Sequence, residues 1–276
     1  PYSTLFRSGK PECGYLHYGW EGYSEALLLY ALALCSPTHP ISADCYPAWT
    51  VTDQGENRDD QDFLYAGPLF IHHFSQAWID LRGIRDPFMQ QKRSDYFENG
   101  RRAVFVQRKY TQLNPLEFVG YDENCWGLSA CDGPSGDQRG PQGQPVRVFG
   151  YAARGVPYGP DDGTLSPSSV LASVPFAPDL ALAALRNMLL RYPQLLSADR
   201  LTTSFNATLS DSDGQPWMSP GHYGLDQGIV FMMIENHRSG WIWQLLRGCA
   251  WLRDGLRNAG FAGGWLDHAG AGAASR

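Results

Sequence analysis

One segment, GYSEALLLYALALC at residues 22–35, is apolar on almost every side of the helix that its composition favours. A helix of this kind needs neighbours all round it, so we expect it to lie inside a larger helical assembly. Four further segments have helical patterns: 68–81, 94–113, 178–193 and 226–261, the last one broken around Ser239-Gly240. Two of these segments begin with proline, which a helix tolerates at its first turn. The sequence predicts a scaffold of about six or seven helices.

Long connections separate these helices, at residues 36–67, 114–177 and 194–225. Connections of this length are uncommon in a compact domain unless they carry function or are disordered. They are rich in Trp, Tyr, Asp, Gly and Pro rather than in Lys and Glu, so we expect them to be ordered and to hold the functional site. Strand-like alternation is scarce, and VRVFGY at 146–151 is the best candidate for a strand.

Composition narrows the range of partners. The net charge is −6, and Lys and Arg are scattered singly or in short pairs. Nucleic acids and anionic membranes need a concentrated basic surface, so neither is an expected partner. No apolar run has the length of a membrane span, and the start PYSTLFRSGK lacks the pattern of a signal peptide. Nine tryptophans and fourteen tyrosines suit a carbohydrate-binding protein, although a large core uses aromatic residues as well.

No pattern in the sequence indicates a metal or another cofactor. The six cysteines are too dispersed for a zinc site or a redox CxxC pair. His72 and His73 are adjacent in a helical segment and point to different faces, so hydrogen bonding in the interior is favoured over a shared metal. A glycine-rich phosphate loop and a GxSxG nucleophile motif are both missing, which leaves nucleotide binding and serine hydrolysis without support.

The stretch YDENCWGLSACDGP, residues 121–134, sets two carboxylates, Glu123 and Asp132, on either side of Trp126. One interpretation is a capped loop in which the indole fills the core and Asp132 begins an Asp-Gly-Pro turn. The other is a sugar site, where an aromatic ring stacks on the pyranose and the carboxylates transfer protons. Small residues around the indole leave room for a ligand to approach.

Acids and aromatic residues recur together at other junctions of helix and loop. Glu21 and Glu25 stand at the start of the first helix, where they also suit the helix dipole. The loop at 149–169 carries acids that also suit a surface turn, and Asp226 stands where it could cap a helix. Glu235 lies in an apolar helical run, so its carboxylate should be paired or have a raised pKa. This recurrence favours a helical enzyme that acts on polysaccharide.

The motifs also resemble a known family. The blocks that carry the resemblance are GYSEALLLYALALCSPTHPI, PLFIHHFSQAWIDLRGIRD, YFENGRRA, YDENCWGLSACDGP, YAARGVPYGPDDGTLSPSS, SVPFAPDLALAALRNM and YGLDQGIVFMMIENHRSG. In this order they resemble the bacterial glucoamylase-like family over roughly residues 14–261. That family is similar to the endo-β-1,2-glucanases and to the glucoamylase-like region of cyclic β-1,2-glucan synthases.

The resemblance implies an (α/α)6 toroid, an all-α fold of six helical hairpins around a central cleft. The toroid has twelve helices and this sequence predicts about half of them. We therefore expect a single domain over residues 1–276 in which the N-terminal hairpins are missing, and a flank that exposes apolar side chains. The resemblance also favours a periplasmic or extracellular location.

The resemblance implies hydrolysis of β-glucan, most of all β-1,2-glucan, by two carboxyl groups with inversion. Glu123 is the expected acid, because Trp126 beside it would desolvate the carboxyl and raise its pKa. Glu25 is the expected base, directly or through a chain of waters. The full set of candidate catalytic residues is Glu123, Glu25, Glu21 and Asp132. Candidate substrate-binding residues are Trp20, Tyr23, Trp126 and Tyr223, which would stack on sugars, and Arg154, Asp162 and Asp226, which would bind hydroxyls or shape the cleft.

Two other functions stay open. A transglycosylase acting on β-1,2-glucan would give ring or elongated products. A catalytically inactive glycan-binding or fragmentary protein would hold the glucan without releasing reducing ends. In each case the expected partner is an oligosaccharide or polysaccharide, and the sequence leaves the oligomeric state open.

Overall fold

The computed structural model describes residues 21–268, apart from 54, 59–60, 141–142, 198–199, 211–212 and 214. Within these ranges the α-helices are α1 (Ala26–Leu34), α2 (Cys45–Trp49), α3 (Leu69–Trp78), α4 (Pro87–Gln91), α5 (Tyr96–Leu113), α6 (Pro167–Ala172), α7 (Pro178–Arg191), α8 (Gly224–Arg238), α9 (Trp241–Arg247), α10 (Ala250–Asn258) and α11 (Gly264–His268). Two 3₁₀ turns, η1 (Thr50–Thr52) and η2 (Pro193–Leu195), accompany them. The mainly helical scaffold predicted from the sequence is confirmed.

Short strands fill much of the long connections. They are β1 (Gly55–Arg58), β2 (Gln61–Leu64), β3 (Ala130–Cys131), β4 (Gln138–Arg139), β5 (Pro145–Val146), β6 (Ala152–Ala153), β7 (Thr164–Leu165), β8 (Leu196–Ser197), β9 (Arg200–Leu201), β10 (Phe205–Ser210) and β11 (Pro216–Met218). They form a three-stranded sheet in the order β11-β10-β7 and the antiparallel pairs β1-β2, β3-β6, β4-β5 and β8-β9. The all-α description was therefore too strict. The strand expected at 146–151 is wrong, since β5 ends at Val146.

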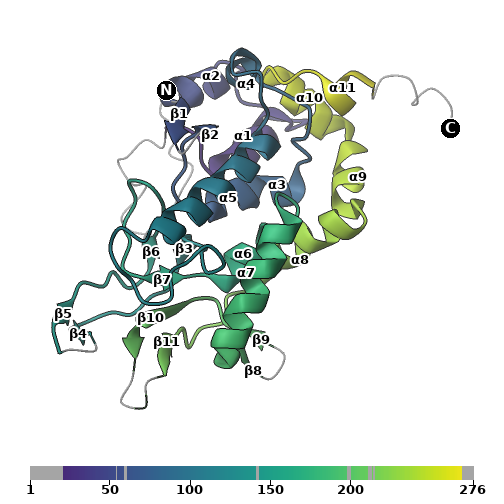
Figure 1. The fold of residues 1–276 in the computed structure, drawn as a ribbon. Coiled ribbons are helices and arrows are strands. Elements are labelled where there is room, and N and C mark those ends of the chain that lie inside the picture. The colour runs from purple at the N-terminus through teal and green to yellow at the C-terminus, as the bar shows by residue number, and fades with distance from the viewer. Residues whose placement is uncertain are drawn as a thin grey trace, which may run out of the picture.

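The helices follow the predicted segments closely, with one further break. Gly240 adopts a left-handed conformation (φ +68°) between α8 and α9, as the Ser239-Gly240 signal predicted. A second break at Gly248-Cys249 then separates α9 from α10, so the segment 226–261 holds three helices rather than two. Figure 1 shows α8, α9, α10 and α11 following one another along one side of the molecule, with β4-β5 and β10-β11 at the opposite end.

Two hydrophobic clusters meet at α3, which contacts α1, α5, α6, α8 and α9. One cluster joins α3 to α5, α6, α7 and α8 and contains Trp126; the other joins α1 and α2 to α10 and α11. Two buried histidines of α3 are tied to the surrounding chain. His72 Nε2 lies 3.0 Å from the Ala66 carbonyl oxygen, and His73 Nε2 lies 2.9 Å from Ser173 Oγ. The interior hydrogen-bonding role expected for both is confirmed.

Large apolar side chains stand exposed on the outer helices. They include Leu32 on α1, Phe231 on α8, Trp241 and Leu245 on α9, and Trp251 on α10. Glu235, on α8 as well, is paired with Arg238 at 2.9 Å, as expected for an acid in an apolar run. None of the helices in the described ranges is long and apolar enough to cross a membrane.

Candidate active site

An open pocket of about 570 Å³ lies where four segments meet. These segments are the residues just before α1, the end of η1, the connection from β2 into α3, and the β3-β6 pair with the loop that follows it. Three carboxylates line the pocket: those of Glu21, Glu25 and Asp53. Aromatic residues share the wall, including Tyr23, Tyr65, Phe70 and Tyr151. Carboxylates among aromatic rings are the combination that carbohydrate chemistry requires.

A hydrogen bond fixes the segment that carries two of these acids. The Tyr23 N–H donates to Asp53 Oδ1 at 2.7 Å and so joins the start of α1 to the end of η1. The Tyr23 ring is buried and stacks on Tyr96, with ring centroids 4.9 Å apart. Tyr23 therefore belongs to the floor of the pocket, and Glu21 and Glu25 extend from a rigid base.

Burial raises the pKa of two pocket acids, Glu25 and Asp53. It raises the pKa of the Glu25 carboxyl above its ordinary value. It raises the pKa of Asp53 to about 7, against the hydrogen bond from Tyr23, and the nearby Asp86 carboxylate adds to the rise. A carboxyl group with a pKa near neutrality can hold a proton at the pH where a glycosidase works, as a general acid must.

A second acidic group adjoins the pocket through Tyr151. This tyrosine is 72% exposed, and its pKa is raised by partial burial and by the charges of Asp226 and Glu25. Tyr151 thus lines the pocket together with Glu25, and the Asp226 charge also acts on its phenol. Burial raises the pKa of Asp226 itself to about 6, although the residue stands in the first turn of α8, where the helix dipole favours the ionised form.

Asp132 lies next to this group. Its Oδ2 accepts the Ser219 hydroxyl at 2.9 Å, and its main-chain carbonyl accepts the Ser204 hydroxyl at 2.6 Å. The Asp132 charge raises the pKa of Tyr223, which is the N-cap residue of α8. Asp132 thus links the end of β3 to the start of α8, the helix that carries Asp226.

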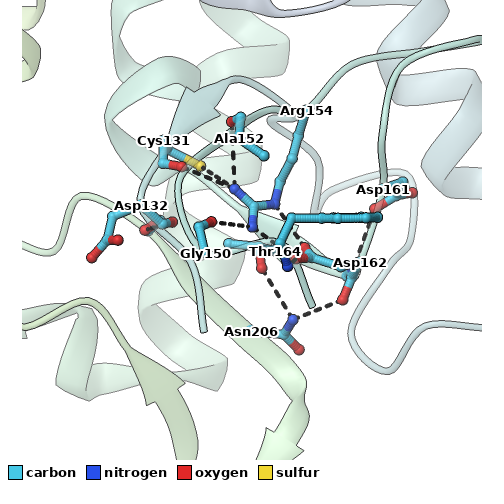
Figure 2. A network of polar contacts seen from close by, with 12 residues as sticks. Cys131, Asp132, Gly150, Ala152, Arg154, Asp161, Asp162, Thr164 and Asn206 are labelled. Carbon is cyan, nitrogen blue, oxygen red and sulfur yellow. Dashed lines mark hydrogen bonds and ion pairs between the residues drawn. The ribbon is translucent and has the colours of Figure 1, made fainter. Parts of the chain in front are cut away.

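Arg154 and Asp162 form a fully buried ion pair behind the pocket wall (Figure 2). Arg154 Nε and Nη2 each donate to a different Asp162 oxygen at 2.7 Å. Neither side chain has a surface that a sugar hydroxyl could reach, so the direct contacts expected of them are not available here. Both residues lie in the loop that carries Tyr151, which is compatible with their other expected role of shaping the cleft.

Two central expectations from the stretch 121–134 need correction. The Glu123 carboxylate is 49% exposed and pairs with Arg108 at 3.0 Å, and Glu123 does not line the pocket. Trp126 is completely buried in the hydrophobic core, with no face free to stack on a sugar. The indole therefore fills the core, and it does not desolvate the Glu123 carboxyl as expected.

The structure gathers part of the predicted set. Glu21, Tyr23 and Glu25 line the pocket, while Asp132, Tyr223 and Asp226 form the adjoining group; Trp20 lies outside the described residues. Sequence reasoning missed Asp53, Tyr65 and Tyr151 as pocket residues. Asp53 stands in an acid-rich stretch, TVTDQGENRDD, in which nothing distinguishes one acid from the next. Tyr151 was noticeable only as an aromatic residue in the loop of Arg154.

In the described part of the chain, no group of three or more His, Cys, Asp or Glu side chains is arranged to hold a metal ion.

Residues 17–250 match the Glycoamylase family, described as "Putative glucoamylase". The chain belongs to this family. An exo β-1,2-glucooligosaccharide sophorohydrolase (non-reducing end) of Parabacteroides distasonis is 28% identical to this glucoamylase-like chain over an alignment of 250 residues, and the match covers 81% of this chain and 31% of the relative.

Solved structures give the same picture of the glucoamylase-like fold. A Bacteroides uniformis protein with the same family description matches with a TM-score of 0.76 and 30% identity, over 90% of this chain and 57% of that one. An endo-β-1,2-glucanase of Chitinophaga pinensis, in complex with sophorotriose and glucose, matches with a TM-score of 0.74 and 26% identity, over 90% and 57%. The chain thus spans about a third of the curated relative and rather more than half of these structures.

Proposed function

We propose that the protein is a glycoside hydrolase that cleaves β-glucan, with β-1,2-glucan as the favoured substrate and with inversion at the anomeric carbon. The observation that carries the proposal is an open pocket lined by Glu25 and Tyr151, with the charges of both Glu25 and Asp226 acting on the Tyr151 phenol and the pKa of both carboxyl groups raised by burial. The relatives support the substrate class, since one is a β-1,2-glucooligosaccharide hydrolase and another is an endo-β-1,2-glucanase.

In the proposed reaction, Glu25 and Asp226 divide the roles of acid and base. The protonated carboxyl gives its proton to the glycosidic oxygen as the bond to the anomeric carbon breaks. The ionised carboxylate takes a proton from a water molecule, whose oxygen forms the new bond on the opposite face of the sugar. Inversion needs the wider spacing of about 6.5–9.5 Å between carboxyl groups.

Exposed tyrosines would bind the sugar rings. Tyr151 projects at one wall, and at another Tyr65 packs against the exposed Tyr158 with ring centroids 5.5 Å apart. Flat aromatic faces at the rim of an open pocket suit a chain of glucose units better than a single small molecule.

The finer fold is part of the proposal. In an (α/α)6 toroid, the exposed apolar side chains of α8, α9 and α10 would face neighbouring hairpins. Side chains such as Phe231, Trp241 and Trp251 would then be buried rather than exposed to water. The mainly helical chain and its likeness to the glucoamylase-like structures support this arrangement.

The test uses the complete natural protein with β-1,2-glucan, β-1,3-glucan and starch, followed by mass analysis of products and a count of reducing ends. We expect shorter linear products from β-1,2-glucan alone, and NMR of fresh product should show the inverted anomer. Glu25→Gln and Asp226→Asn should each lower turnover by about 10²–10⁴-fold. Glu235→Gln, on the same helix as Asp226 but in an exposed pair with Arg238, is the matched control and should leave turnover unchanged.

The pH profiles of the two variants assign the roles. Loss of the base removes the acidic limb of the rate profile, and loss of the acid removes the alkaline limb. Ring or elongated products would instead favour a transglycosylase. Glucan binding without new reducing ends would favour an inactive glycan-binding protein, and full activity in both variants would overturn the assignment of this pair.

A further inference from the structure

Arg154 uses its buried guanidinium to join three segments of chain, those around Cys131, Gly150 and Asp162. Besides the two bonds to Asp162, its Nη1 donates to the Cys131 carbonyl at 2.9 Å and its Nη2 donates to the Gly150 carbonyl at 2.8 Å. Asp162 in turn accepts the main-chain N–H groups of Phe149 at 3.1 Å and Thr164 at 3.2 Å. Figure 2 shows these contacts converging on the guanidinium, with Asn206 attached to Asp162 and Thr164 from below.

The two main-chain carbonyls that Arg154 holds are the neighbours of site residues. Cys131 directly precedes Asp132, and Gly150 directly precedes Tyr151. The Asp132 side chain points away from the guanidinium, toward the side where Ser219 binds it (Figure 2). Arg154 therefore holds the backbone of both positions and leaves their side chains free to face other groups.

Gly133 shows how closely this arrangement is built. A Cβ atom at that position would lie 2.1 Å from Arg154 Nη2 and 2.7 Å from the Gly150 carbonyl oxygen. Only a residue without a side chain lets the guanidinium approach both strands at once. The β3-β6 pairing, with Cys131 opposite Ala152, adds main-chain contacts across the same place.

We propose that Arg154 is a positioning residue of the active site: it sets the distance between the segment that carries Tyr151 and the segment that carries Asp132, which leads through Tyr223 to the start of α8. This inference rests on the proposed function, because the distance matters for catalysis only if these residues form a glycosidase site. An arginine suits this place because its planar fork binds a carboxylate with two donors and still has donors for two carbonyls. A lysine offers three donors from one point and cannot span the same set.

A purely structural ion pair would behave differently from a positioning one. Breaking it would lower the fraction of folded protein while each folded molecule kept its KM and kcat. Displacing Tyr151 and Asp132 instead changes each folded molecule. A displacement of about 1 Å in a site can lower the rate by about 10²-fold.

The test compares Arg154→Met and Arg154→Lys with the wild type in the complete natural protein, with rates normalised to folded protein. Met keeps much of the apolar stem, and Lys keeps the charge. The matched control is Asp80→Asn. Asp80 is also a fully buried acid paired with an arginine, Arg82 at 2.8 Å, but it does not line the pocket.

We expect Arg154→Met to raise KM about tenfold and to lower kcat/KM by about 10²-fold, with Arg154→Lys in between. Hydrogen exchange should rise at residues 130–134 and 149–153 while α3 and α5 stay protected. Asp80→Asn should lower the melting temperature and leave KM and these two segments unchanged. Where Arg154→Met does not fold, the double variant Arg154→Met/Asp162→Leu removes both buried charges together and takes its place.

Unchanged KM and kcat per folded molecule in Arg154→Met would overturn the proposal, as would hydrogen exchange that rises evenly over the whole chain. If the wild type cleaves none of the glucans, the proposed function fails by itself. The hydrogen exchange comparison then decides alone whether Arg154 holds the two segments, and no change in them would reject the positioning role.

Discussion

Asp53 should make the protein less stable as the pH rises toward neutrality. Its carboxyl borders the pocket, accepts the Tyr23 N–H and has a pKa raised from 3.8 to about 7. The folded state therefore holds this proton more tightly than the unfolded state does. Below about pH 4 both states are protonated and the group costs nothing; between pH 4 and 7 the unfolded carboxyl ionises first, so stability falls as the pH rises.

The rise in pKa gives the size of the effect. At about 1.4 kcal/mol for each pH unit, the rise corresponds to roughly 4 kcal/mol for a wholly desolvated group. Because the Asp53 carboxyl borders an open pocket, solvent screening reduces this to about 2 kcal/mol. Asp53→Asn keeps the shape and the acceptor for Tyr23 but cannot ionise. It should match the wild type near pH 4 and exceed it by about 2 kcal/mol at pH 8.

Urea unfolding at about pH 4.5, 6 and 8 measures this difference. The raised pKa values of Glu25 and Asp226 occur in both proteins and cancel in the comparison. Thr52→Val is the matched control, since it removes a polar pocket group that does not titrate, and its difference from the wild type should be the same at every pH. A difference between Asp53→Asn and the wild type that stays constant from pH 4.5 to 8 would refute the reasoning.

Three further substitutions test the site from different sides. Trp126→Ala should cost about 3–5 kcal/mol of stability in urea unfolding, because the ring is completely buried, and should leave KM of the folded fraction unchanged; a changed KM would return Trp126 to the site. Glu123→Gln should cost at most about 1 kcal/mol and leave turnover alone, since the Glu123 carboxylate is 49% exposed, and a loss of turnover would contradict this placement. Tyr151→Ala should raise KM for glucan about threefold to tenfold with Tyr151→Phe close to the wild type, and equal effects of both would show that the hydroxyl rather than the ring matters.

The helical scaffold was predictable because the sequence signals of a helix lie within the helical segment itself. The apolar face, the proline at a first turn and the glycine at a break all act within one segment, and α1, α3, α5, α7 and α8 follow their predicted ranges. The strands beside the site were not predictable, since β3 and β6 have only two residues each and pair across a separation of about twenty residues. A pair this short leaves no periodic pattern in the sequence.

The residue types of the site were predictable, but the sequence did not show which of the acids lies in the pocket. Glu25 and Glu123 look alike in sequence, since each stands two residues after a tyrosine. What separates them is burial: the Glu25 carboxyl lines the pocket, while the Glu123 carboxylate faces solvent and Arg108. Burial depends on which distant segments pack together, and the approach of residues 52–53 to the start of α1 could not be read from either segment alone.

The hydrogen bonds of Arg154 also affect how the glycan preference of such a site can be changed by mutation. Arg154 grips main-chain carbonyls, those of Cys131 and Gly150, and not the side chains that face the pocket. The path of the loop is therefore set independently of the residue at position 151. Exchanging Tyr151 for another side chain would therefore change the group that contacts a sugar and leave the backbone path of the loop unchanged. Mutational libraries at this position should yield many folded proteins with altered glycan preference, whereas libraries at Gly133, where any side chain meets the guanidinium, should yield few.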